Sequence, residues 1–385
     1  MRRTLFDEDH ESFRTMIREF IHREVTPHFE EWFERGYVDR DLYRKLGEIG
    51  VFSMTVPEEY GGEGITSYKY KAILMEETVK AGVTLGTAGV HTDLGLPYIL
   101  AFGNDEQKRR WLPQFMTGEA MYALAMTEPG TGSDLAGMRT TAKRSDDGSH
   151  YVLNGSKTFI TGGVLADRVI VAARTSPLDE ANRRFGISLF NVDAKAAGYQ
   201  VGRKLEKIGL RTSDTAELSF SDVIVPAEDL LGVEGEGFGY LAHNLPLERL
   251  TIAYAAYCQA KAAVKFAIDY VKDRKVFGQP VASFQNTKFE LAACQARVDA
   301  VEGLVDRAVE AYDLGELTPV DAAKAKLVAT DAADEVIDRC LQLHGGYGYM
   351  LEYPIARLYT DARVNRIYGG TSEVMKLIIA KDMGL

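Results

Sequence analysis

The stretch SDDGSHYVLNGSKTFITGG, residues 145–163, decides the fold, because it interrupts a chain whose other parts have the pattern of helices. The Asp-Gly pair at 147–148 and the Asn-Gly pair at 154–155 are typical two-residue hairpin turns. β-Branched and aromatic residues alternate around them. The segments RVIVAAR, GISLFNV and TAELSFSDVIVP follow with no helical pattern between them. We therefore predict an antiparallel β domain over residues 121–232.

The segment before this domain has helical periodicity. In FRTMIREFIHREV, apolar residues recur every three to four positions, at Phe13, Ile17 and Phe20. A loop with the sequence VPEEYGGEGI separates this helix from the next one, YKAILMEETVKAG. Residues 1–120 are therefore predicted to form an α-helical domain.

Long helices return after the β segments. Val298, Val301 and Val305 keep the three-to-four spacing of one helix face. Thr318 and Pro319 form a good N-cap and first-turn pair for the following helix. We therefore predict a bundle of antiparallel helices over residues 233–385.

Composition excludes several classes of protein. The 385 residues are too many for one core, and the net charge of −11 argues against nucleic acid as a partner. No apolar run is long enough for a signal peptide or a membrane span. The three widely spaced cysteines predict neither a disulfide framework nor a metal site, so we expect a reducing, cytoplasmic location.

Four motifs each have an ordinary structural interpretation. AMTEPGTGSDLAG (125–137) reads as a Gly-rich turn, and FITGG (159–163) as a strand end with a core aromatic. DRKVFG (273–278) reads as a solvated helix end, and CLQLHGGYGY (340–349) as a helix cap with a satisfied histidine. GTGSDL is not a dinucleotide fingerprint, because strands follow it where a βαβ unit requires a helix.

Taken together and in order, the motifs are far more specific. AMTEPGTGSD, LNGSKTFIT, DRKVFG, QLHGGYGYMLEYP and YGGTSE resemble those of the acyl-CoA dehydrogenase family, with the long-chain branch most similar. The resemblance covers essentially the whole chain. It implies an N-terminal helical domain, a middle β-barrel and a C-terminal four-helix bundle with FAD between them. It also implies a homotetramer built as a dimer of dimers, acyl-CoA as substrate and electron-transfer flavoprotein as electron acceptor.

The resemblance raises a question about the catalytic base. Many family members carry a glutamate at the second position of the YGGTSE loop, where this chain has Gly369. Other branches place it on the helix that opens the C-terminal bundle, and there Glu248 falls at the matching position, at the edge of an apolar face. We therefore predict that Glu248 removes the α-proton. Gly369 keeps the backbone N–H that polarises the thioester carbonyl.

The resemblance also assigns the binding residues. The isoalloxazine and pyrophosphate contacts fall on Met126, Thr127, Gly132, Ser133, Phe159 and Thr161. The adenosine-side contacts, supplied across a subunit interface, fall on Arg274, Phe277, Gln285, Gln342, Leu343, His344, Gly345 and Gly346, and further FAD contacts on Thr371 and Glu373. The substrate contacts fall on Ser133, Pro246, Leu247, Arg249 and Gly370. Phe159 stands where many relatives have a tryptophan that is assigned to electron exit, which leaves that route open.

Several alternatives remain within and outside this family. The acyl group could be branched or terpenoid, because a sequence does not show the floor of a cavity. An acyl-CoA oxidase is disfavoured by the chain length, and a DNA-associated flavoprotein by the acidic charge and the lack of a basic C-terminal domain. A thioester-binding protein without activity is suggested by Gly369 alone and disfavoured by Glu248.

Overall fold

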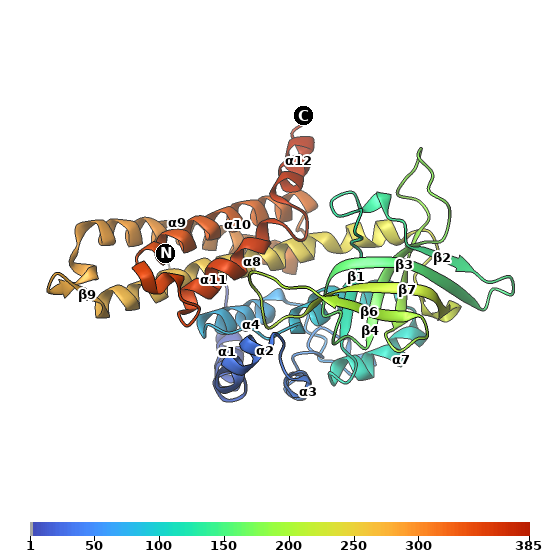
Figure 1. Ribbon diagram of the computed structural model, residues 1–385, viewed down its shortest axis with the longest axis horizontal. Coiled ribbons are helices and arrows are strands. Elements are labelled where there is room, and N and C mark those ends of the chain that lie inside the picture. The colour runs from blue at the N-terminus through green and yellow to red at the C-terminus, as the bar shows by residue number, and fades with distance from the viewer. Residues whose placement is uncertain (1–2) are drawn as a thin grey trace.

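The computed structural model describes residues 3–385 and shows an elongated molecule. The sheet lies at one end, the long helices extend to the other end, and the N-terminal helices lie along one side (Figure 1). The predicted order of helical, β and helical parts is confirmed. The N-terminal part contains α1 (Glu8–Phe20), η1 (Ile21–Val25), η2 (Thr26–His28), α2 (Phe29–Arg35), α3 (Arg40–Glu48), η3 (Glu58–Tyr60), α4 (Tyr68–Lys80), α5 (Ala88–Val90), η4 (His91–Gly95), α6 (Leu96–Phe102) and α7 (Asp105–Met116).

The middle part is one twisted sheet. Its elements are β1 (Tyr122–Ala125), η5 (Leu135–Gly137), β2 (Thr141–Arg144), β3 (His150–Thr161), β4 (Arg168–Arg174), β5 (Ile187–Asp193), β6 (Tyr199–Lys204), β7 (Thr215–Pro226), η6 (Ala227–Asp229) and β8 (Leu230–Leu231). The strand order is β6-β7-β3-β2-β4-β5-β8, with β1 beside β4.

Two expectations about this sheet are corrected. The path ends at β6 and at the two-residue β8, which do not pair with each other, so the described strands form an open sheet rather than a closed barrel. The sheet is also not wholly antiparallel, because β4 runs parallel to both β1 and β2. A chain that enters β4 from a loop rather than a hairpin is free to take either direction.

The central strand β4 is buried on both faces. Ile170 and Ala172 pack into the core shared with the N-terminal helices, whereas Val169 and Val171 pack into the core on the opposite face of the sheet. A strand covered on both faces needs a continuous apolar run, which explains the sequence RVIVAAR.

The two predicted turns in the opening stretch differ in outcome. Gly148, at φ +72°, turns between β2 and β3 as predicted. The Asn154-Gly155 turn is wrong, because β3 continues through it and only shifts its register against β7. Asn154 exchanges hydrogen bonds with Asp222 of the neighbouring strand, at 3.0 and 2.9 Å. A bulge therefore uses the same pair of residues that a hairpin would use.

The C-terminal part is built on three long helices. Its elements are α8 (Gly237–Asp273), β9 (Lys275–Val276), β10 (Gln279–Pro280), η7 (Val281–Ser283), α9 (Gln285–Asp313), α10 (Pro319–Gln342), η8 (Gly345–Tyr349), α11 (Pro354–Ala362), η9 (Arg363–Arg366) and α12 (Ser372–Asp382). Alanine and valine side chains of α8, α9 and α10 form one core. The shorter α11 packs on α8 and α10, and α12 packs on α10. Thr318 caps α10 as predicted, its side chain accepting the Asp321 N–H at 3.1 Å.

Within residues 3–385, no helix is long and apolar enough to cross a membrane. Cys258, Cys294 and Cys340 are buried free thiols. The same part of the chain holds no cluster of side chains suited to a metal ion.

Candidate active site

Glu248 lies in the N-terminal half of α8, and its side chain is inside the protein. The residue is only 5% exposed, and burial raises the pKa of its carboxyl to about 7. The Tyr98 hydroxyl of α6 donates a hydrogen bond to Oε1 at 3.2 Å, which opposes that rise. A carboxyl with a pKa near 7 can accept a proton and release it again near neutral pH.

The YGGTSE loop packs directly against this turn of α8. The Arg249 guanidinium donates from Nε to the Gly369 carbonyl at 3.4 Å, and Lys326 of α10 donates from Nζ to the Gly370 carbonyl at 2.6 Å. Ile252, one turn after Glu248, lies under the loop. The two residues predicted to carry the chemistry are therefore brought to the same place.

Gly369 has the backbone that its proposed role needs. Its φ is +62°, a conformation that favours glycine. A Cβ added at Gly369 would come within 2.4 Å of Ile252 Cδ1. No acceptor among residues 3–385 takes the Gly369 N–H, so this donor remains available to a bound carbonyl oxygen.

A cavity of about 730 Å³ lies between α4, α6 and α8 and continues to the loop between α9 and α10. Pro246 and Leu247, predicted as substrate contacts, are part of its wall. Pro246 does not end α8, which runs through it as one helix. Most of the wall is apolar, but Lys71 and Asp93 form an ion pair of 2.7 Å within it. Further lining residues are Met54, Tyr68, Leu74, Leu96, Pro97, Leu100, Tyr312 and Leu317.

The motif around Met126, just after β1, contacts the motif around Phe159 on β3. The Thr158 N–H donates to the Thr127 carbonyl at 2.9 Å. The buried Lys157 donates to the Met126 carbonyl at 2.9 Å and to Glu128 Oε1 at 2.8 Å. Sequence reasoning missed Glu128 and Lys157, although both lie inside the quoted motifs, because only the fold shows that they pair.

Phe159 is the most strained residue in this region. It has φ +60°, at the register shift of β3, and its side chain is 68% exposed. A bulky residue in this conformation costs about 1–2 kcal/mol, and such outliers cluster at ligand sites. The ordinary interpretation of Phe159 as a core aromatic is therefore wrong, and its exposed placement fits the predicted contact with the isoalloxazine ring. Thr161 follows two residues later on the same strand, its hydroxyl 3.4 Å from that of Thr215.

A second group of predicted residues collects at the opposite end of the molecule. Arg274 directly precedes β9, Phe277 lies in the turn between β9 and β10, and Gln285 starts α9. Gln342 ends α10, and Leu343 to Gly346 follow it. The label β9 marks this end of the molecule in Figure 1. Arg274 stacks over the Tyr347 ring at 5.4 Å. Phe277 is 95% exposed and has φ +49°. At about 1.5 Å per residue, Arg274 lies about 39 Å along α8 from Glu248.

The side chain of His344 in this second group is already engaged. Its Nδ1 donates to the Cys340 carbonyl at 2.9 Å, and the ring stacks on Tyr270 with centroids 4.4 Å apart. Burial lowers its pKa. Leu343 is half-buried beside it, as the C-cap of α10. The structural interpretation of this histidine is therefore confirmed for its ring.

The residues present fit an extended dinucleotide. At Gly132, Gly345 and Gly346, an added Cβ would meet no atom of this chain within 4 Å, so the backbone there is open to close approach by a ligand. Ser133 lies in the same exposed loop as Gly132. Thr371 is the N-cap of α12 and accepts the Val374 N–H at 3.3 Å, and the exposed Glu373 occupies its first turn.

Comparison with known proteins agrees with this arrangement. The long-chain specific acyl-CoA dehydrogenase of Sus scrofa mitochondria is 44% identical over 99% of this chain and 88% of its own length. A crystal structure of acyl-CoA dehydrogenase from Geobacillus kaustophilus is 43% identical, with a TM-score of 0.94 and 99% of each chain covered. An acyl-CoA dehydrogenase complexed with FAD, from Bacillus anthracis, is 34% identical, with a TM-score of 0.90, 98% of this chain covered and 67% of that one.

Domain models of the family match the chain from end to end. The acyl-CoA dehydrogenase N-terminal domain matches residues 7–119, the middle domain residues 123–223 and the C-terminal domain residues 235–384. The chain therefore belongs to the acyl-CoA dehydrogenase family, whose members are oxidoreductases.

Proposed function

We propose that this protein dehydrogenates the α,β bond of acyl-CoA thioesters, with Glu248 as the base, and passes the electrons to electron-transfer flavoprotein. The observation that carries the proposal is the buried Glu248 carboxylate on the part of α8 that packs against the Gly369 loop, whose N–H has no acceptor among residues 3–385. FAD, when bound, accepts the hydride from the β-carbon. The assignment of a flavin site is supported by the strained, exposed Phe159 and by the loop that contains Met126, Thr127, Gly132 and Ser133.

The chain's own residues divide the remaining chemistry between them. Glu248 takes the α-proton, and its pKa of about 7 suits that task. The Gly369 N–H donates to the thioester oxygen as negative charge develops there, a type of stabilisation that contributes about 3–4 kcal/mol. Arg249 holds the loop against α8, so the donor and the base keep their relative positions.

The cavity wall supports a long or branched acyl chain. The space extends past Pro246 and Leu247 to the α9–α10 loop, and its wall is mostly apolar. An anaerobic titration of the flavin absorbance with a ladder of straight and branched acyl-CoAs ranks these substrates. Preference for the shortest chains would contradict the proposed role of the deep cavity.

A homotetramer completes the proposal. Arg274, Phe277 and Gln285 lie too far from Glu248 to serve the same flavin from one chain. We propose that they reach the adenosine half of the FAD of a neighbouring subunit.

The variant Glu248→Gln tests the assignment of the base. It keeps the shape of the side chain and removes the proton acceptor, so acyl-CoA should still bind and perturb the flavin spectrum. We expect the rate of flavin reduction to fall by more than about 10⁴-fold, the upper range for a general base, because the glutamine amide cannot accept the α-proton. The control is Glu310→Gln on the exposed face of α9, which should leave the rate unchanged. Near-normal reduction in Glu248→Gln means that another group is the base.

A further inference from the structure

Glu248 is held by a residue from a distant part of the chain. Tyr98 of α6 is fully buried, and its hydroxyl is the hydrogen-bond donor to the Glu248 carboxylate, at 3.2 Å. Burial and the neighbouring carboxylate raise the phenol pKa well above its ordinary value. The hydroxyl therefore stays protonated and acts only as a donor.

Asn244 lies one helical turn before Glu248, on the same side of α8. It is 6% exposed, and its Nδ2 is fully enclosed with no acceptor among residues 3–385 in hydrogen-bond geometry. The amide is near enough to the Tyr98 hydroxyl to lower the phenol pKa. A buried donor without a partner is unfavourable, and four residues along a helix place it next to the Glu248 side chain.

The charged groups around Glu248 are engaged elsewhere. Lys71 of α4 pairs with Asp93 of η4 at 2.7 Å and donates to Thr251 at 3.0 Å. Lys71 lowers the pKa of Glu248 and Asp93 raises it, so the two effects oppose each other. Arg249 also lowers this pKa, but its Nε donates to the Gly369 carbonyl.

Two further titratable side chains lie farther from the Glu248 carboxylate than Lys71, Asp93 and Arg249. Lys326 of α10 donates to the Gly370 carbonyl, and the exposed His243 lines the cavity one turn before Leu247. Neither one contacts the carboxylate in the part of the chain described. Tyr98 is therefore the only group there that hydrogen-bonds Glu248.

We propose that Tyr98, assisted by Asn244, is a positioning residue that holds the Glu248 carboxylate in one orientation beside the Gly369 loop. The inference rests on the proposed role of Glu248 as the base. A donor that bonds the charged form of a carboxyl also favours that form, so Tyr98 keeps the base ionised near neutral pH.

The variant Tyr98→Phe tests this inference in the FAD-loaded enzyme. Reduction of the flavin by acyl-CoA is followed in a stopped-flow instrument from about pH 5.5 to 9. The wild-type rate should rise with pH through the pKa of Glu248, about 7. Without the hydroxyl, that inflection should move up by roughly one pH unit, so the rate at low pH falls about tenfold and the two profiles converge at high pH.

Tyr68→Phe is the matched control. Tyr68 is also buried and lines the same cavity, but its hydroxyl lies 3.4 Å from Thr251 Oγ1 instead of Glu248. Its profile should keep the wild-type inflection. A Tyr98→Phe profile that is lowered equally at every pH, with an unmoved inflection, overturns the inference.

A second probe covers the case in which Tyr98→Phe does not fold. Fluorotyrosine incorporated only at position 98 keeps the shape of the ring and makes its hydroxyl a stronger donor, so the inflection should move to lower pH. No movement, or movement upward, overturns the inference. If Glu248→Gln retains normal reduction, the proposed base is wrong, and that result is separate from any shift caused by Tyr98.

Discussion

Gly369 lies against the Ile252 side chain, and this contact limits whether the catalytic carboxylate can be transferred from position 248 to position 369. The exchange of Glu248→Gly with Gly369→Glu would return the carboxylate to its commoner position. The new Cβ would meet Ile252 Cδ1 at 2.4 Å, on a backbone with φ +62°. The left-handed backbone alone costs a bulky residue about 1–2 kcal/mol.

We therefore expect the double exchange to be almost inactive and the triple variant, with Ile252→Ala added, to recover part of the activity. Removing the Ile252 side chain opens the space in which a glutamate side chain at position 369 can turn toward the α-carbon. The measurement is the rate of flavin reduction with short and long acyl-CoAs. Ile252→Ala alone is the control, and equal rates in the double and triple variants would show that Ile252 does not obstruct the carboxylate.

The sequence predicted the role of a single residue where its interacting group is close in the chain, or where the resemblance to the family assigned the role. Glu248, Gly369 and Phe159 came from the resemblance. Tyr98 and Lys157 were missed because their roles depend on groups 150 and 29 residues away in the chain. No periodicity in a sequence reports such pairs.

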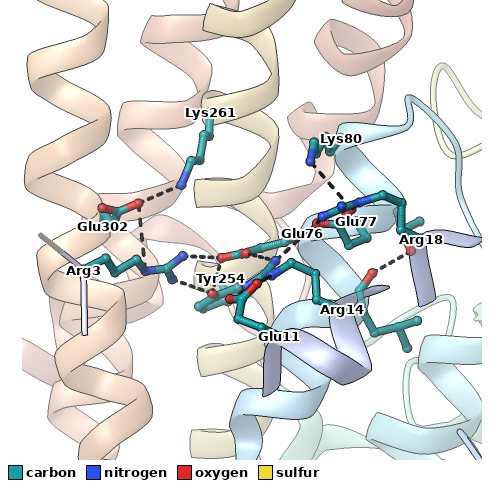
Figure 2. A network of polar contacts seen from close by, with 12 residues as sticks. Arg3, Glu11, Arg14, Arg18, Glu76, Glu77, Lys80, Tyr254, Lys261 and Glu302 are labelled. Atoms are coloured by element: carbon teal, nitrogen blue, oxygen red, sulfur yellow. Dashed lines mark hydrogen bonds and ion pairs between the residues drawn. The ribbon is translucent and has the colours of Figure 1, made fainter. Parts of the chain in front are cut away.

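At the scale of elements, one polar network joins three helices to the N-terminal segment (Figure 2). Arg3 donates to Glu76 of α4 at 2.5 Å, to Tyr254 of α8 at 2.8 Å and, through two nitrogens, to Asp306 of α9 at 2.6 Å. The side chains of Arg3, Glu76 and Asp306 are each less than a fifth exposed. Tyr254 is fully buried. Arg14 adds a bond of 2.6 Å to Glu76.

We expect Arg3→Ala to destabilise the protein by about 2–3 kcal/mol, because it leaves the partly buried Asp306 carboxylate without its cation and removes one of the two arginines that bond Glu76. The measurement is the midpoint of thermal unfolding. The control is Lys80→Ala, which removes the 3.7 Å pair between an exposed lysine and Glu77; because Arg14 and Arg18 still pair with Glu77, the loss should be less than about 1 kcal/mol. Equal losses for the two variants would mean that the Arg3 contacts are not stabilising.

The same network gives a dependence on pH. Arg3 and Arg14 lower the pKa of Glu76 below its ordinary value, against the opposing effect of burial. A depressed carboxyl pKa contributes stability that is present above the unfolded-state pKa and is lost as pH falls through the folded-state pKa. The difference between wild type and Arg3→Ala should therefore shrink below about pH 4.

Elements were predicted well where their signals are local. The Thr318 cap and the Gly148 turn depend on neighbouring residues and are confirmed. The Asn154-Gly155 bulge and the parallel pairing of β4 depend on which strand lies alongside, so a local pattern could not show them. The open edge of the sheet is likewise a property of the packed domain.

At the scale of the whole molecule, the distance between the two groups of predicted FAD contacts leads to a test of assembly. We expect a tetramer in sedimentation experiments. Phe277→Asp should weaken both assembly and the retention of FAD, because it places a charge on a 95% exposed aromatic that is proposed to face a neighbouring subunit. Leu178→Asp, in an exposed loop of the middle domain, is the control. A monomer that retains FAD tightly would contradict the cross-subunit contacts.

The open end of the sheet at β6 has a consequence for how this protein avoids aggregation. An unpaired strand can add strands from other chains, and long flat apolar edges are the most hazardous. Here β6 carries the exposed Arg203 and the half-buried Lys204, and a register shift between Val201 and Lys204 interrupts its pairing with β7. Charge and irregular geometry thus make this edge a poor template for cross-chain strand addition during folding. Replacing both cations with valine is expected to increase the fraction of the chain that aggregates when it refolds at high concentration.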